Sequence, residues 1–395
     1  MQAPDGEFSF TRLEKVVFGP GRIAELGREL DRRGLRRAVV ATGKSLGGSP
    51  LLEAVTSALG ERCAEVFKGC SQHVPMQTVR ELAAELVRLD ADSVVSFGGG
   101  SPIDTAKVAV ASVLNGRDMT VEAGELDLAS AFAADQGRPA LAHIAVPTTL
   151  SAGEYTPAGG ATDEKTRIKR ATVDPRLQPK VVFNDPELTG ATPDWLWVAT
   201  GMRALDHAIE SAYSARRQPF VDALASKAIR LLTEHLDPSI RTRGADRIAH
   251  RGHCQIAAWC SLFGGFNTGL GVSHALGHQI GPMWDVPHGV TSCITLPHAM
   301  RFMASAAPER FAPIAEGLGL PFDAAAPRPA AMACADKVAA FIGRFDVPHT
   351  LREAGVGHNH LSRIAGAVHE EIDSFGAVGR PMRFEDVTAL LEAAY

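Results

Sequence analysis

The first half of the chain alternates short apolar runs with longer amphipathic segments. Four runs rich in β-branched residues predict strands, at residues 37–42, 64–67, 93–97 and 143–146. Segments of helical period lie between them, of which residues 76–89 give the clearest pattern. Strands that alternate with helices are typical of a parallel sheet covered by helices, so this half predicts an α/β domain.

The pattern changes close to residue 187. The remaining chain is rich in Ala and Leu at helical spacing and contains almost no strand-like run. We therefore expect two domains, an α/β domain over residues 1–187 and an all-α domain over residues 188–395, with the boundary near residues 186–193.

The composition argues against several classes of protein. The 395 residues are 45% hydrophobic and 22% charged, which is enough for two cores. The net charge of −5 and the absence of long Lys/Arg runs argue against nucleic-acid binding. No 18-residue apolar stretch predicts a membrane span, and residues 1–20 lack the apolar core of a signal peptide. The six cysteines form no CxxC pair, so a reduced, cytoplasmic setting is expected.

A glycine-rich turn follows the strand predicted at residues 93–97. Gly98, Gly99 and Gly100 allow a close backbone approach to a ligand, and a helix is expected directly after them. Ser101 is the expected N-cap, and Asp104 would complete a capping box. The free amides of such a helix start favour a diphosphate, which predicts a dinucleotide site. A plain strand-to-helix turn is the alternative.

Two further segments extend this prediction. Thr148, Thr149 and Ser151 follow the strand at residues 143–146 and could line the nicotinamide and ribose side of the cofactor, although a plain Ser/Thr loop would look the same. Gly43 and Lys44 end the first strand, where an acidic residue normally binds the ribose 2′-hydroxyl. They leave room and charge for a 2′-phosphate, so both NADH and NADPH stay open.

Several histidines lie close together in the sequence of the helical half. In a helix, His274 and His278 stand at i and i+4, about 6 Å apart on one face. A turn over residues 282–287 would return His288 to the same place. His207 lies upstream, with Arg203 one turn before it. A single histidine would be ordinary, but the group predicts a catalytic site built from two helices and a loop.

These motifs together resemble the iron-type, or group III, alcohol dehydrogenase superfamily, and within it they look most like the maleylacetate reductases. The resemblance runs through nearly the whole chain, and its markers are residues 17–21, 98–107, 146–156, 185–189, 201–210, 274–278 and 287–289. It implies an NAD(P)-binding α/β domain with a parallel sheet followed by an all-α catalytic domain, the plan shared with dehydroquinate synthase. It also implies a homodimer.

One substitution departs from the metal-dependent members. Their helix reads Gly-Met-Asp-x-x-x-His, and the aspartate joins three histidines in holding Fe²⁺ or Zn²⁺. Residue by residue, the histidine ligands fall on His207, His274 and His288, whereas the aspartate position holds Arg203. His278 matches the histidine that assists proton transfer.

The arginine disfavours a metal. A guanidinium about 4 Å from a divalent ion costs roughly 8 kcal/mol at an effective dielectric of about 20, and arginine cannot lose its proton. Asp206 is expected to point about 100° around the helix from His207, so it does not replace the missing ligand. We therefore expect no bound metal. Should one bind, its ligands would be His207, His274 and His288.

The expected function is an NADH- or NADPH-dependent reductase that transfers hydride to a small carbonyl or conjugated enone. Arg203 could bind a substrate carboxylate or stabilise an oxyanion, and His274, His278 or His288 could deliver the proton. Maleylacetate is the nearest named substrate. A metal-dependent alcohol dehydrogenase, a dehydroquinate-synthase-like lyase and a binding protein without activity remain alternatives, and Arg203 could instead pair with Asp206 or Glu210.

Overall fold

The computed structural model describes residues 6–116, 118, 141–166, 169–269, 271–375 and 377–395. It divides into two compact units, Phe10–Thr192 and Pro193–Tyr395, and residues 6–9 belong to the second. The sequence placed this division after residue 187. It falls after Thr192 because that hydroxyl donates to the Thr148 carbonyl at 2.8 Å, which holds the segment on the first unit.

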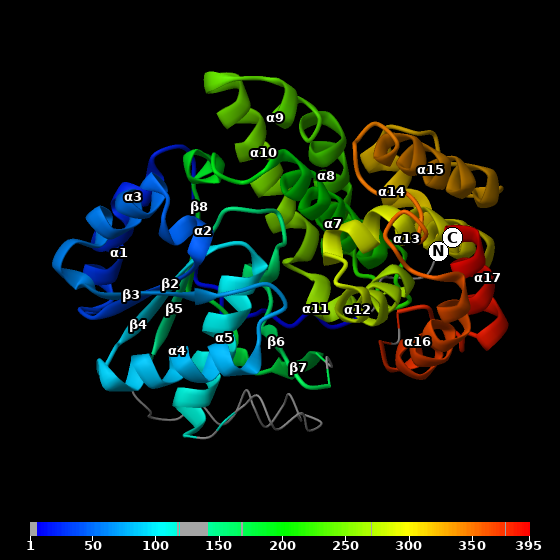
Figure 1. Ribbon diagram of the computed structural model, residues 1–395. Helices are drawn as coiled ribbons and strands as arrows, with labels where there is room; N and C mark the ends of the chain where they lie inside the picture. The colour runs from blue at the N-terminus through cyan, green and yellow to red at the C-terminus, as the bar shows by residue number, and fades with distance from the viewer. Residues whose placement is uncertain (1–5, 117, 119–140, 167–168, 270, 376) are drawn as a thin grey trace. The chain divides into compact units, whose positions relative to one another are not determined.

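A parallel sheet forms the centre of the first unit (Figure 1). Its order is β1-β8-β5-β4-β2-β3, and every pair is parallel. The bounds are β1 Lys15–Phe18, β2 Ala38–Gly43, β3 Cys63–Cys70, β4 Ser93–Gly98, β5 Ala142–Pro147 and β8 Val181–Asn184. The four predicted strands are confirmed as β2 to β5. The sequence missed β1 and β8, which are only four residues long and carry little period of their own.

Helices cover both faces of this sheet. They are η1 Arg22–Glu25, α1 Leu26–Arg32, α2 Lys44–Gly47, α3 Pro50–Leu59, η2 Gly60–Arg62, α4 Met76–Arg88 and α5 Gly100–Asn115. Alternate residues of β2 point to opposite faces: Val39 packs with Val79 of α4, and Val40 packs in the separate cluster of α1 and α3. The central strands are therefore apolar on both sides, which is why their sequences read as continuous hydrophobic runs.

A small antiparallel hairpin completes the first unit and was not predicted. Its strands are β6 Ala158–Thr162 and β7 Lys169–Val173, flanked by the 3-10 turns η3 Gly153–Tyr155, η4 Pro175–Leu177 and η5 Pro186–Thr189. The buried ammonium of Lys107 on α5 donates to the carbonyls of Thr156 and Ala158, each at 2.7 Å. This lysine joins α5 to the hairpin.

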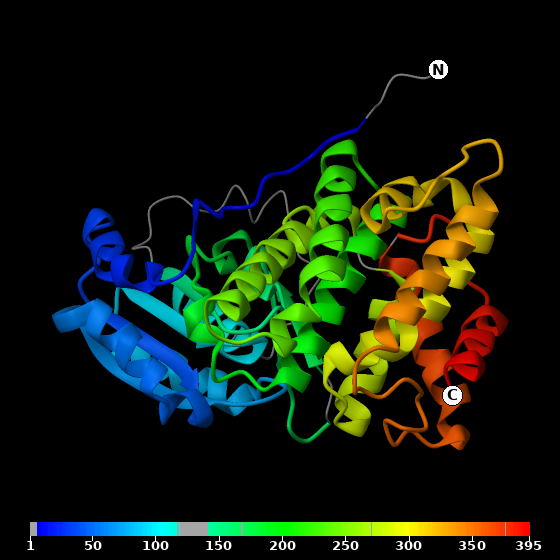
Figure 2. The ribbon, with the colours of Figure 1, turned by 90° about the horizontal axis from the view of Figure 1, so that it is seen from above.

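The second unit is helical, as predicted, and has no strand among its described residues (Figure 2). Its elements are α7 Asp194–Tyr213, α8 Pro219–His235, α9 Pro238–Arg241, α10 Gly244–Leu262, α11 Gly265–Thr268, α12 Val272–Trp284, α13 His288–Ala306, η6 Pro308–Phe311, α14 Ala312–Leu318, α15 Pro327–Ile342, η7 His358–His360, α16 Leu361–Phe375 and α17 Phe384–Ala394. Most of α7 is buried, so it forms the core helix of this unit.

The turn expected at residues 282–287 is shorter than predicted. Helix α12 continues through Pro282 to Trp284 and ends at Asp285, whose φ of 55° is left-handed. The chain then enters α13 directly at His288. The predicted start of the turn was wrong because the helix accommodates Pro282 in its last turn.

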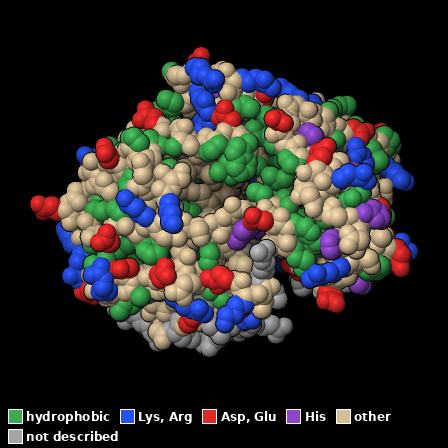
Figure 3. All heavy atoms as spheres, viewed as in Figure 1, with side chains coloured by type: hydrophobic (Ala, Val, Ile, Leu, Met, Phe, Trp, Pro, Cys, Tyr) green, Lys and Arg blue, Asp and Glu red, His purple; other side chains and the backbone are tan. Residues whose placement is uncertain are grey.

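The surface carries mixed charge on the face drawn in Figure 3, where Lys and Arg side chains lie among Asp and Glu side chains. Within the described chain, none of the helices combines the length and apolarity needed to cross a bilayer.

Candidate active site

The glycine-rich turn opens the amino end of α5. Gly98 has φ of +145°, and a Cβ there would lie 2.8 Å from the ring of Pro102. Gly99 is the N-cap in extended backbone, with no side-chain cap, and α5 starts at Gly100. The expected cap at Ser101 and capping box with Asp104 are therefore wrong, because the glycines allow the helix to begin before Ser101. The first amides of α5 keep no side-chain acceptor from the cap and stay open to an anion.

The hydroxyl segment lies directly against this turn. The Thr148 amide donates to the Gly98 carbonyl at 2.9 Å. A Cβ on Gly99 would lie 3.2 Å from the Thr149 hydroxyl, and one on Gly100 would lie 3.3 Å from that of Ser151. The hydroxyls of Thr149 and Ser151 are buried without a hydrogen-bond partner in the described part of the chain. Such orphaned donors beside open helix amides fit the diphosphate of a dinucleotide.

The end of β2 faces the same place. From β2 the chain passes to β3 on one side and then to β4 on the other, so the strand order reverses at β2. Ligands of open α/β sheets bind where this happens, at the carboxyl ends of the strands. Gly43 ends β2, Lys44 begins α2 and is exposed, and a Cβ on Gly98 would lie 3.4 Å from Leu46 of α2. The structure thus brings the three predicted cofactor segments together.

The predicted histidines of the second unit form a row. Ring centroids are 4.8 Å apart for His207 and His274, 6.3 Å for His274 and His278, and 5.8 Å for His278 and His288. They come from α7, α12 and the first residue of α13. His207 and His274 are buried, whereas His278 and His288 are half-buried. The row therefore runs from the core of the unit toward its accessible side.

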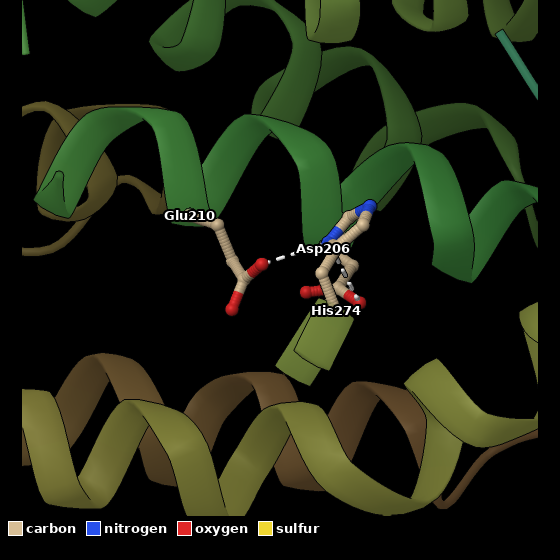
Figure 4. Close-up of side chains that lie close together, drawn as sticks. All are labelled: Asp206, Glu210 and His274. Carbon is tan, nitrogen blue, oxygen red and sulfur yellow. Dashed lines mark hydrogen bonds and ion pairs between the residues drawn. The ribbon is translucent and has the colours of Figure 1, made fainter. Parts of the chain in front are cut away.

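Glu210 of α7 orients the middle of this row (Figure 4). Its carboxylate accepts hydrogen bonds from the amides of Gly271 and Ser273 at 2.9 and 2.8 Å. It also accepts from the Tyr213 hydroxyl at 2.9 Å and lies 2.7 Å from His274 Nδ1. An imidazole that donates through Nδ1 keeps the lone pair of Nε2 free. Glu210 thereby holds the start of α12 and sets the face that His274 presents.

Arg203 is buried beside a second carboxylate. Its Nη1 lies 3.5 Å from Asp206 Oδ2 and donates to the Ser292 hydroxyl at 3.2 Å. Asp206 also accepts from the hydroxyls of Ser273 at 2.8 Å and Ser292 at 2.6 Å. Asp206 does not point away from the site, as the sequence suggested, because α12 and α13 both supply hydroxyls to it.

Burial sets the protonation of this cluster. Burial and, after it, the nearby Glu210 raise the pKa of Asp206 to about 8, while Arg203 opposes the shift. Burial also raises the pKa of Glu210 and lowers the pKa of His207 and His274 well below the usual value. The two buried imidazoles are therefore neutral at physiological pH.

Two family models match this chain. The model for iron-containing alcohol dehydrogenases matches residues 14–186, and that for the C-terminal part of the Fe-containing alcohol dehydrogenase family matches residues 197–395. The chain belongs to the iron-containing alcohol dehydrogenase family. It is an NAD(P)-dependent oxidoreductase that acts on a small molecule.

Individual relatives agree with this assignment. Lactaldehyde reductase of Escherichia coli (strain K12) is 30% identical over 386 residues, which cover 97% of this chain and 98% of the relative. Maleylacetate reductase of Burkholderia cepacia is 32% identical over 310 residues, or 78% of this chain and 79% of the relative. The crystal structure of maleylacetate reductase from Agrobacterium tumefaciens superposes with a TM-score of 0.79 at 28% identity, covering 100% and 99% of the two chains.

This family member holds its outer histidine with a residue that the sequence did not single out. Glu371 of α16 lies 2.9 Å from His278 Nδ1 and accepts from the Gln279 amide at 2.7 Å. The imidazole and Gln279 lower the pKa of Glu371 against the effect of burial. No local pattern could have found Glu371, because it lies 93 residues from His278. Asp206 and Glu210 could have been found from their spacing of three and seven residues from Arg203.

The iron site of the family is poorly matched here. In the described chain, one group of three potential ligands has its donor atoms within 4.8 Å of one another, namely Asp206, Glu210 and His274. Its carboxylates already accept amide and hydroxyl hydrogen bonds. His207 and His288 do not belong to this group, and Arg203 occupies the aspartate position. These side chains do not fit a divalent ion without rearrangement.

Proposed function

We propose that this protein is an NADH- or NADPH-dependent reductase that delivers hydride to a small carbonyl or conjugated enone bearing a carboxylate, without a metal. The observation that carries the proposal is Arg203, a buried guanidinium beside the histidine row at the place of a metal-binding aspartate. A fixed positive charge can stabilise an oxyanion as a Lewis acid would.

Arg203 has further N–H groups that can donate hydrogen bonds to a substrate. Among the described residues only its Nη1 has partners, Asp206 and Ser292. These two contacts hold the guanidinium in one orientation. The remaining nitrogens of the planar fork suit a carboxylate, which accepts two parallel hydrogen bonds from arginine.

Proton delivery is assigned to the outer histidines. When bound, the nicotinamide would supply the hydride. The oxyanion or enolate that this leaves on the substrate then takes one proton. His278 and His288 are half-buried and can exchange protons with water, whereas His207 and His274 are buried. Glu371 holds His278 in place, and Glu210 does the same for His274. Imidazole is suited to this step because its ordinary pKa lies near neutrality.

The cofactor is assigned to the glycine-rich end of the first unit. The residues that would hold it are Gly43, Lys44, Gly98, Gly99, Gly100, Ser101, Asp104, Thr148, Thr149 and Ser151. The open amides of α5 and the orphaned hydroxyls of Thr149 and Ser151 support a diphosphate there. Exposed Lys44 supports NADPH as well as NADH. A homodimer remains part of the proposal, and light scattering would test it.

Initial rates of NADH and NADPH oxidation with maleylacetate, in buffer with a strong chelator, test the function. Turnover under these conditions is expected, since relatives named maleylacetate reductase align over most of the chain. Activity that appears only after adding Fe²⁺ or Zn²⁺ would contradict the metal-free mechanism and favour a metal-dependent alcohol dehydrogenase. No activity with or without metal would exclude maleylacetate, and lactaldehyde would be the next substrate tried.

A further inference from the structure

A second group of histidines lies outside the catalytic row, where helices α8 and α10 pack against each other. His235 is the last residue of α8, and His250 and His253 stand three residues apart on α10. His235 Nδ1 lies 2.9 Å from His250 Nδ1. The rings of His235 and His253 stack with centroids 4.2 Å apart and an interplanar angle of 12°. We name this group the α8–α10 histidine cluster.

We propose that the α8–α10 histidine cluster binds a divalent transition-metal ion of the Zn²⁺ type. Imidazole nitrogen is a preferred ligand of Zn²⁺, Ni²⁺ and Cu²⁺, and residues one turn apart on a helix present their side chains to the same ion. The site is independent of the proposed reductase activity and of the histidines assigned to it.

The distance between two ring nitrogens supports an ion between them. Zn–N bonds of 2.0–2.1 Å at a tetrahedral angle separate two ligand nitrogens by about 3.3 Å. His235 Nδ1 and His250 Nδ1 are 2.9 Å apart, so an opening of about 0.4 Å would admit the ion. His253 is exposed, and its ring would have to rotate out of the stack with His235 to supply the third nitrogen. Water would complete the coordination.

The tautomer required for binding is favoured by a carboxylate. Glu234 Oε2 lies 3.9 Å from His235 Nε2, on the side of the ring away from His250. A carboxylate on that side favours a proton on Nε2, which leaves the Nδ1 lone pair for a metal. The proton that His250 Nδ1 then holds in the 2.9 Å contact would move to His250 Nε2 or to water when the ion binds. A neutral imidazole is the form that binds metals.

The helix end adds a further attraction. His235 lies in the last turn of the 17-residue helix α8, whose carbonyl end carries partial negative charge and favours a cation. Lys227 acts in the opposite direction, because its positive charge near His235 repels a cation. A bound ion would join the end of α8 to the middle of α10 and would stabilise the folded unit.

Calorimetric titration with Zn²⁺ alone tests the site, using full-length protein stripped with a chelator. Wild type should bind Zn²⁺, and His250→Asn should weaken that binding at least 10-fold. His349→Asn is the matched control, because it makes the same substitution at an exposed histidine that lies far from the α8–α10 histidine cluster in sequence. His288→Asn is the second control. It removes a histidine of the catalytic row and should leave this binding event in place.

Thermal unfolding gives a second measurement. A free Zn²⁺ concentration of 100 times Kd multiplies the folding equilibrium constant by about 100, so the unfolding midpoint should rise in wild type and not in His250→Asn. Reductase activity in chelator should be equal in both proteins, which separates this proposal from the proposed function. Equal Zn²⁺ affinity of wild type and His250→Asn would overturn the proposal. So would absence of binding by wild type, which would make the group an ordinary proton-sharing contact.

Discussion

Arg203 is the residue on which the proposed chemistry depends. Where the family resemblance leads us to expect a metal-binding aspartate, this chain carries a positive charge. Asp206 Oδ2 lies 3.5 Å from Arg203 Nη1, and the Ser292 hydroxyl accepts a hydrogen bond from the same nitrogen. These polar partners offset part of the cost of burying the guanidinium.

Arg203→Lys should separate these two roles. Lysine keeps the positive charge beside Asp206 but lacks the planar guanidinium that can donate two parallel hydrogen bonds. The kcat/KM for a carboxylate-bearing substrate should therefore fall about 10- to 100-fold. A matched substrate that lacks the carboxylate should change by less than about 3-fold. Steady-state kinetics of both substrates measure the difference. An equal loss for the two substrates would mean that Arg203 does not bind the carboxylate.

At the scale of elements, the start of α5 shows how the sequence and the structure differ. The strand, the glycines and the following helix were all predictable from local pattern. The capping residue was not, because the glycines allow α5 to begin one residue before Ser101. The consequence is favourable for binding, since a side-chain cap would compete with a phosphate for the same amides.

Gly99→Ala tests this helix start. The backbone at Gly99 has φ of −83°, which alanine can adopt, so strain is not the issue. The added Cβ would lie 3.1 Å from Thr149 Cγ2 and 3.2 Å from its hydroxyl. The KM for NADH and NADPH should rise at least about 10-fold because the diphosphate loses room.

Gly366→Ala on α16 is the matched control, because a Cβ there meets nothing within 4 Å. It should leave the KM for both cofactors unchanged and stabilise α16 by up to about 1 kcal/mol. Wild-type cofactor affinity in Gly99→Ala would place the diphosphate elsewhere.

At the scale of the whole molecule, buried ionisable groups make stability depend on pH. Glu154 is buried in the first unit, and one of its carboxylate oxygens has no partner among the described residues. Burial raises its pKa to about 7. The unfolded chain therefore loses this proton at lower pH than the folded protein does, and stability falls as pH rises from about 4.5 to about 7.

Glu154→Gln should remove this dependence. The shift corresponds to about 3 kcal/mol, so the variant should gain that much stability over wild type between pH 5 and pH 8. Urea unfolding of both proteins across this range measures the difference. Other buried groups, such as His143, are present in both proteins, so their contributions cancel in the difference between the two free energies of unfolding. A difference that does not change with pH would show that Glu154 is not neutral in the folded protein.

The sequence alone determined the class of fold and supplied the candidate catalytic residues. Strand and helix periods are local, and so are the glycine turn, the i,i+4 histidines and the arginine in place of aspartate. Each of these features depends on residues that lie within a few positions of each other in the sequence. Short edge strands such as β1 and the hairpin β6–β7 escaped because four or five residues carry too little period.

Only the tertiary structure decided which partners these residues meet. Glu210 reaches His274 across 64 positions, Ser292 reaches Arg203 across 89, and Glu371 reaches His278 across 93. His235 and His250 likewise meet because two helices pack together. Such contacts depend on how helices pack, and the packing energy is spread over many apolar side chains rather than encoded near the polar ones. The orientation of the proposed catalytic groups therefore depends on how the folded core packs.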